Sequence, residues 1–423
     1  MRPNDKGWFK DYLELRKSAL MDLSRPEIRK ASHPEYTLYR VLQPTGLMYG
    51  QSVATMGIPD FDAWDEKEKL KILLAESLIS SAILFYDKPV VTEDDLNNAI
   101  NKAIDNIGNF YNNIFPELAI SRKTIFGRRK SPIEVAEKVL DKRIEHASTF
   151  GGNFWIYFFH NSLLFLDVFI FGQWIHTNAD RIVADFFRYE REELRFSVVK
   201  VIAAASHANK DVALEERRLY QYFVESTDLS AERRKEALKI FEEGFAIEQI
   251  NLPSENSWIL KRFFLEVAIL TIWADKKVEQ VELDFLSQFS SYLGFNEDDL
   301  ENSMISIEGF MLDHWGELEY VQDKQEFDHV GEQFVKRVAR LAEKNRTRLV
   351  KRIQENEQTA LLMRKASSNE LTLEEKEKIR LQLIHVLRSI PTFGILSLPK
   401  DFLTLPVLLR ILPENLFAEA IRG

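Results

Sequence analysis

Apolar residues recur at intervals of three and four along most of the chain, whereas the strict alternation of a half-buried strand is nearly absent. In segment 67–85, for example, Leu70, Leu73, Leu74 and Leu78 share one helical face. Glycine and proline, which sandwiches and barrels use at their many turns, number only 16 and 13 in 423 residues. We therefore predict an all-α protein built from many helices.

The composition excludes several classes of protein. Hydrophobic residues make up 45% of the chain and charged residues 29%, so it can bury a large core and is not mainly disordered. Cysteine is absent, which excludes disulfides, thiolate metal sites and a cysteine nucleophile. The net charge of -10 offers no overall attraction to nucleic acid, and we expect no such partner. Residues 1–20 lack the apolar stretch of a secretion signal, so we expect a cytoplasmic location.

Breaks in the helical pattern suggest three domains. Residues 1–150 form an N-terminal helical region that ends near Gly151-Gly152. Residues 151–320 hold an apolar helix and a duplicated helical module. Residues 321–423 hold a long amphipathic helix, expected over 323–365, and a proline-interrupted C-terminal segment. The basic face of the long helix is expected to meet solvent or the acidic residues at 297–301.

An internal repeat relates 201–237 to 267–303, which align without a gap at an offset of 66. The matching pairs include Ala208 with Ala274, Val212 with Val278, Glu216 with Glu282, Phe223 with Phe289, and the N-cap residues Ser230 with Asn296. Each copy predicts a helix, a tight turn, a second helix, a short turn and a capped third helix. We interpret the repeat as a duplicated helical hairpin and expect 201–243 and 267–309 to superpose.

The turn in each copy resembles the TerB family, known from tellurite-resistance systems, and the resemblance covers roughly 178–320. That family carries alanine-aspartate-glycine, a valine two residues later and a glutamate four beyond it. Here the copies contain Ala208-Asn209-Lys210-Asp211-Val212 with Glu216, and Ala274-Asp275-Lys276-Lys277-Val278 with Glu282. The resemblance implies a cation site at the acidic turns. Its candidate oxygen ligands are Asp211, Glu216, Asp275, Glu279 and Glu282.

Departures from the TerB pattern oppose a cation. Asn209 replaces the first aspartate, and lysines occupy both glycine positions. The alternative is that Glu216 and Glu282 lie in the first turn of a helix and complement its dipole. We favour this second interpretation.

In the C-terminal segment 372–418, a helix is expected to run to about Ser389. Four prolines seven or eight residues apart follow it, which forbid one regular helix and predict short ones. The segment resembles the LETM family, inner-membrane proteins of mitochondria with bacterial relatives. The resemblance rests on Leu387-Arg388-Ser389-Ile390-Pro391-Thr392-Phe393, Leu398-Pro399, Leu405-Pro406 and Leu412-Pro413. In that family this piece is membrane-embedded and a ribosome-binding domain follows it. Because the sequence stops at Gly423, we do not expect ribosome binding or ion exchange to carry over. A TerB-like module joined to a LETM-like tail resembles the LETM-related biofilm-associated proteins of bacteria.

Two apolar windows, 154–175 and 390–412, are long enough to cross a bilayer core of about 30 Å. Asp167 lies near the centre of the first window and costs about 2.5–3.5 kcal/mol to insert. The second window contains Lys400, Asp401 and Arg410. We therefore favour burial in protein for both. Asp167 should then meet a Lys, Arg, Tyr or Trp donor from another helix, and 390–423 should pack on the helical body. Peripheral or integral contact with the inner membrane stays open.

Catalytic motifs are absent from the sequence. It contains no glycine-rich phosphate loop, no nucleophile elbow and no zinc-protease motif, and its eight histidines are scattered. The basic residues within 122–130 are expected to form an exposed loop. We therefore expect no catalytic residue and no cofactor, and we predict a scaffold or adaptor in a stress-, envelope- or biofilm-related process, with an unknown protein partner. Two alternatives are a divalent-cation sensor that uses the acidic turns and an unrecognised enzyme with a buried carboxylate such as Asp167.

We predict weak or no specific binding of divalent cations, because Asn209 and the three turn lysines oppose it. Titration with Ca²⁺ or Mg²⁺ in a calorimeter should give no site of micromolar affinity. Micromolar binding that disappears in Glu282→Ala would show that the acidic turns do hold a cation.

Overall fold

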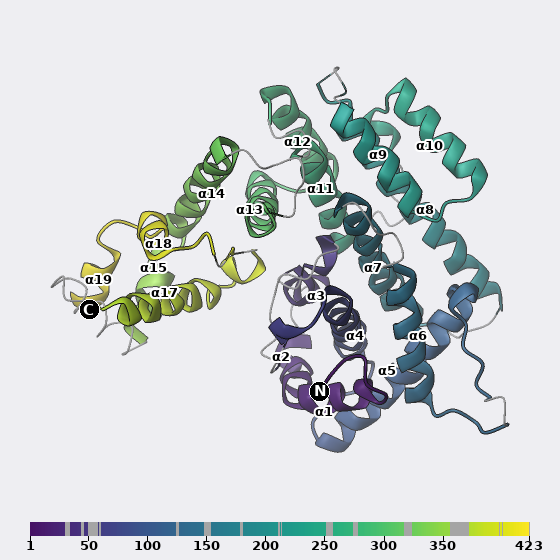
Figure 1. Cartoon of the computed structure of the whole chain (residues 1–423). Coiled ribbons are helices and arrows are strands. Elements are labelled where there is room, and N and C mark those ends of the chain that lie inside the picture. The colour runs from purple at the N-terminus through teal and green to yellow at the C-terminus, as the bar shows by residue number, and fades with distance from the viewer. Residues whose placement is uncertain are drawn as a thin grey trace. The chain divides into compact units, whose positions relative to one another are not determined.

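The computed structural model describes residues 1–423 except 30–33, 44–45, 50–57, 59–60, 124–126, 148–153, 178–180, 210–211, 213, 251–256, 274–277, 317–323, 356–371, 397, 400 and 423. The described residues form 18 α-helices, short 3-10 turns and one isolated β-bridge, with no strand among them (Figure 1). The all-α prediction is confirmed.

The chain divides into two compact units, residues 1–293 and residues 294–423. The domain boundaries expected at 150/151 and 320/321 both fall outside the described residues, and so does the Gly151-Gly152 pair. Those boundaries therefore stay predictions.

The first part of unit 1 is built around one fully buried helix, α4. Asp65 and Glu68 form a capping box at its start, and every residue from Leu70 to Leu84 is buried. A helix that is buried on all sides belongs at the centre of a bundle, and α4 indeed packs against five other helices. The helices of this part are α1 (Trp8–Leu23), α2 (Pro26–Arg29), α3 (Pro34–Leu42), α4 (Glu66–Leu84), α5 (Glu93–Ile114), α6 (Pro132–Ala147) and α7 (Phe154–Trp174).

The repeated segments share four helix boundaries at the repeat offset. The helices are α8 (Arg181–Ser206), α9 (Leu214–Ser226), α10 (Ala231–Glu243), α11 (Trp258–Ile272), α12 (Gln280–Tyr292) and α13 (Glu297–Asp313). Four pairs of boundaries lie 66 residues apart: Ser206 and Ile272, Leu214 and Gln280, Ser226 and Tyr292, and Ala231 and Glu297. Ser230 and Asn296 cap α10 and α13 as predicted. The unit boundary at Leu293, however, separates α13 from α11 and α12. Superposition of the copies and a TerB-like duplication stay predictions.

The long helix expected over 323–365 is instead two helices, α14 (Lys324–Lys344) and α15 (Arg346–Glu355), and residues 356–371 lie outside the described ones. The break falls at Asn345, whose side-chain amide donates to the Leu341 carbonyl at 2.9 Å. The main-chain bonds across this residue persist, from the Asn345 amide to the Leu341 carbonyl at 3.2 Å and from the Leu349 amide to the Asn345 carbonyl at 3.0 Å, so the interruption is limited to one residue. The prediction of one continuous helix is therefore wrong at Asn345.

The basic face of α14 is paired with acids of α13, as expected. Arg340 bonds Glu301 at 2.6 Å, and Lys344 bonds Asp298 at 2.6 Å. Arg337 meets Glu308 at 3.0 Å, and Glu308 is fully buried. Burial raises the pKa of Glu308 to about 7, although Arg337 opposes the shift.

The C-terminal segment packs against α14 and α15 within unit 2. Its helices are α17 (Leu373–Arg388), α18 (Leu405–Ile411) and α19 (Leu416–Arg422), with a 3-10 turn at Phe393–Ile395. α18 contacts α14 and α17, and α19 contacts α15. Leu403, Leu408, Ile411 and Leu416 are buried there. Both predictions, short helices and a segment packed on the helical body, are confirmed.

Neither apolar window yields a candidate membrane span. The first corresponds to α7, and the second is divided between a 3-10 turn and α18. Among the helices that the structure describes, none is both long enough and apolar enough to cross a bilayer.

We predict that Gly331→Ala destabilises unit 2, although alanine usually stabilises a helix relative to glycine. Alanine in a helix interior normally stabilises it by about 1 kcal/mol over glycine. At Gly331, however, a Cβ atom would lie 2.7 Å from Cε2 of Phe402, whose ring also packs on Phe327 and Phe334. Overpacking of this kind costs about 1–3 kcal/mol.

Thermal unfolding should show a lower Tm for Gly331→Ala. Gly316→Ala is the control, because a Cβ at that position meets no atom within 4 Å. An unchanged or raised Tm for Gly331→Ala would mean that Phe402 does not anchor the C-terminal segment.

Candidate functional site

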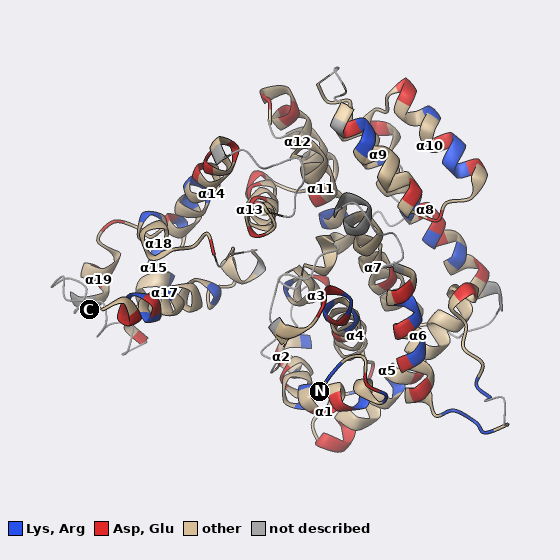
Figure 2. Ribbon diagram, in the orientation of Figure 1, with Lys and Arg blue, Asp and Glu red and all other residues tan. Residues whose placement is uncertain are grey.

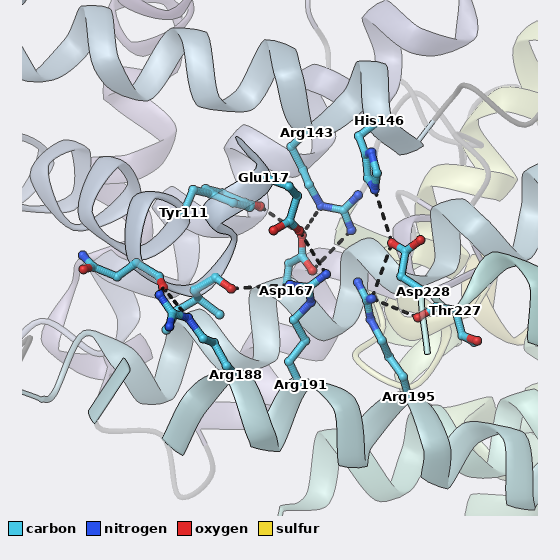
Figure 3. Close-up of polar contacts among 12 residues, drawn as sticks. Tyr111, Glu117, Arg143, His146, Asp167, Arg188, Arg191, Arg195, Thr227 and Asp228 are labelled. Atoms are coloured by element: carbon cyan, nitrogen blue, oxygen red, sulfur yellow. Dashed lines mark hydrogen bonds and ion pairs between the residues drawn. The ribbon is translucent and has the colours of Figure 1, made fainter. Parts of the chain in front are cut away.

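The most unusual feature of unit 1 is a cluster of buried arginines where α5, α6, α7 and α8 meet the end of α9 (Figure 3). Arg143 comes from α6, and Arg191 and Arg195 come from α8. Arg143 and Arg195 are almost fully buried. Arginine is rarely buried unless its charge is paired, so the partners of these side chains decide what the cluster can do.

Asp167 of α7 lies at the centre of the cluster and is 1% exposed. Arg143 donates to its carboxylate from Nε at 2.5 Å and from Nη2 at 3.3 Å, and the Tyr111 hydroxyl donates at 3.2 Å. Burial, reinforced by the Asp167 charge, raises the pKa of Tyr111 well above its usual value, so the phenol keeps its proton. The predicted donors from other helices are confirmed, and Asp167 faces protein.

Arg191, on α8, contacts residues at the end of α5. Its guanidinium carbon lies 4.0 Å from the centre of the Phe115 ring, a cation–π contact, and Arg143 approaches the same ring at 5.6 Å. Arg191 also meets Glu117 at 3.2 Å and the Ile114 carbonyl at 3.4 Å. Burial lowers the pKa of Arg191, and Glu117 opposes that shift.

Arg195 closes the cluster on the turn after α9. It donates to the Thr227 carbonyl at 2.9 Å and lies 3.6 Å from the Asp228 carboxylate, which His146 also contacts at 3.2 Å. Burial and the neighbouring arginines lower the pKa of Arg195 to about 9. Burial raises the pKa of Asp228, but His146 and Arg195 outweigh it and hold that pKa well below its usual range. Both partners of the pair therefore stay charged at pH 7.

His160 lies beside the cluster and contacts two main-chain carbonyls. Its Nδ1 and Nε2 lie 3.1 Å and 2.9 Å from the carbonyl oxygens of Ser226 and His146. Burial, with Arg143 nearby, lowers the pKa of His160 to about 4.

The arginines of α8 bind carbonyls that α5 leaves unpaired at its C-terminus. Arg188 donates to the Asn113 carbonyl at 2.9 Å and 2.6 Å, and Arg191 reaches Ile114. The last carbonyls of a helix lack intrahelical donors and carry partial negative charge, so cations stabilise them. The cluster therefore works as a clamp that holds α8 on α5, α6 and α7.

Two further triads in unit 1 repeat the chemistry of Arg143, Asp167 and Tyr111. In one, Arg16 and Tyr12 of α1 bond Glu76 of α4. In the other, Arg262 and Tyr39 bond Glu266 of α11, at 2.9 Å and 2.6 Å. Each buried carboxylate thus receives a guanidinium and a phenol, which satisfies its charge and its lone pairs. These triads tie α1 to α4 and α3 to α11.

The residues proposed as cation ligands are only partly described, because Asp211 and Asp275 lie outside the described residues. Glu216 is buried in the first turn of α9, and Glu279 is exposed. Glu282 is buried and accepts from the Glu279 amide at 2.7 Å and from the Asn209 side chain at 3.3 Å. These contacts match the helix-start interpretation. No group of three potential ligands occurs among the described residues. The cation site stays a prediction.

Comparison with known proteins gives one partial similarity. Co-chaperone protein DjlA from Vibrio vulnificus, in strains YJ016 and CMCP6, is 29% identical to this chain over 122 residues. The match covers 27% of this chain and 42% of the co-chaperone, so the chain spans less than half the length of these curated relatives. No family model matches the chain, and no solved structure matches it with significance.

We predict that Asp167→Ala destabilises unit 1 by about 3–5 kcal/mol, because it leaves the Arg143 charge buried without a partner. The triple substitution Arg143→Met, Asp167→Leu and Tyr111→Phe should recover most of that loss, since it removes both charges and the hydroxyl that would otherwise lose its acceptor. Urea unfolding measures both effects.

Asp22→Ala is the matched control, because Asp22 forms an exposed surface pair with Arg25. A loss for Asp167→Ala no larger than that of the control would mean that the buried pair does not stabilise the helix junction.

Proposed function

We propose that this protein is a non-catalytic helical adaptor that holds a protein partner and acts together with the protein-folding machinery. The observation that carries the proposal is the match of 122 residues to a protein named as a co-chaperone. An all-helical architecture suits an adaptor, because packed helices present rigid outward faces to a partner.

The buried arginine cluster supports a structural role over a catalytic one. Asp167 is saturated by Arg143 and Tyr111, and its 1% exposure leaves no route for a substrate. A general acid or base must reach the proton that it transfers. These contacts favour a structural role for Asp167 in our proposal.

The outward face of α8 offers the contact surface. Phe186 and Tyr189 lie three residues apart and are 55% and 58% exposed, while Arg191 and Arg195 hold the opposite face of the helix. Exposed aromatic side chains are enriched where proteins bind each other. Because the matched relative is named a co-chaperone, we take a chaperone as the partner at this face.

The finer parts of the proposal rest on sequence resemblance. The TerB-like turns within 178–320 and the LETM-like segment 372–418 support a stress-, envelope- or biofilm-related process in the cytoplasm, near the inner membrane.

The test is affinity capture from cells after mild cross-linking, with the captured proteins identified by mass spectrometry. A chaperone should be enriched with the wild-type chain, and its yield should fall at least about tenfold for Phe186→Ser with Tyr189→Ser, as expected for interface hot spots. Leu214→Ser with Leu238→Ser is the control, because these two leucines are also exposed in unit 1. Absence of any chaperone, or equal loss in both variants, would contradict the proposal.

A further inference from the structure

A basic cavity lies between α5 and α6, at the loop that joins them. Its volume is about 430 Å³, within the range of small-ligand sites. Figure 2 shows lysine and arginine residues gathered on this loop. The charged side chains that line the cavity are Arg122, Arg128, Arg129, Lys130, Asp105 and Glu134.

The loop backbone holds its two basic stretches side by side. Lys123 and Arg129 form an antiparallel bridge, and the Lys130 amide donates to the Arg122 carbonyl at 2.8 Å. Gly127 takes a positive φ of 79°, which side-chain-bearing residues rarely adopt, and so permits the turn. Residues 124–126 lie outside the described residues.

Two of the four cations at the cavity, Arg122 and Lys130, are held in place by uncharged acceptors. Arg122 bonds the Asn109 side-chain oxygen, and the Lys130 ammonium bonds the Ser121 carbonyl at 2.7 Å. Both acceptors are uncharged. Within the part of the chain that the structure describes, Arg122, Arg129 and Lys130 form no ion pair, whereas Arg128 lies 3.5 Å from Glu134.

The two acids of the lining do not cancel this charge. Glu134 accepts hydrogen bonds from the Ser131 amide at 2.8 Å and from the Ser131 hydroxyl at 3.2 Å. These bonds belong to the capping box at the start of α6. The Ser131 backbone bond holds the pKa of Glu134 below its usual value. Four cations face two carboxylates, Asp105 and Glu134, so the cavity keeps a net charge of about +2 by this count.

We propose that this cavity binds a phosphate group, carried either by a soluble phosphate ester or by a lipid headgroup. Guanidinium groups match the oxygens of phosphate with paired, charge-assisted hydrogen bonds. The charge of a phosphate monoester, about -1.5 to -2 at neutral pH, balances the excess of the lining. Among the described residues, the lining includes no aromatic side chain on which a base could stack.

Two assays on the full chain separate the sources of the phosphate. Calorimetry at low salt measures binding of glycerol phosphate, and co-sedimentation measures binding to phosphatidylcholine vesicles with and without phosphatidic acid, whose headgroup is a phosphate monoester. Arg129→Gln should weaken binding about tenfold in whichever assay detects it, since a charge-assisted bond is lost. Arg218→Gln, an exposed arginine on α9, makes the same charge change away from the cavity and should have little effect.

Glu134→Gln should change phosphate binding in the opposite direction to Arg129→Gln. Glutamine at this position can still cap the start of α6, so the fold is kept while a competing charge is removed, and binding should tighten. A signal in either assay with these three responses supports the proposal and identifies the source. No binding in either assay, or equal weakening by Arg129→Gln and Arg218→Gln, would overturn it.

Discussion

Unit 1 depends on one buried ion pair, that of Arg143 with Asp167. The carboxylate lies in the middle of α7, among apolar side chains, where an unpaired charge would cost several kcal/mol. Pairing it requires α6 to bring Arg143 alongside and α5 to supply Tyr111. The Phe115 ring contacts both Arg143 of α6 and Arg191 of α8, so α8 packs at the same junction. The outward face of α8, which we assign to a partner, is therefore positioned by the contacts of this buried junction.

The same device recurs in the triads of Glu76 and Glu266, each with an arginine and a tyrosine. A buried ion pair seldom adds more stability than an apolar contact of equal volume would. It does impose direction, because a guanidinium and a phenol must approach the carboxylate at defined angles. In a bundle of many helices with similar apolar faces, such pairs select one arrangement of neighbours. We take this selection as the reason that an adaptor keeps so much charge in its core.

Local features were predictable from the sequence. The caps at Ser230 and Asn296 form as expected, because each depends on residues within one turn. The burial of Asp167 and the type of its donor were also predictable, since a mid-helix carboxylate must find a cation or a hydroxyl. The identity of the donor was not, because Arg143 is 24 residues away and α6 meets α7 only in the folded chain. A signal was present: Arg143 follows Val139 by one turn, on the apolar face of α6. The break at Asn345 was missed because the apolar stripe continues through it and only one residue separates the two helices.

The most direct test of the clamp is hydrogen exchange measured on Arg191→Met, which removes the charge and keeps the apolar stem of the side chain. If the arginines hold α8 to the end of α5, amides at the start of α8 and in the last turn of α5 should exchange faster, while those of α11 and α12 keep their protection. Unchanged protection at α8, together with loss of chaperone capture, would contradict the account, because it would make Arg191 a contact for the partner and not a structural clamp.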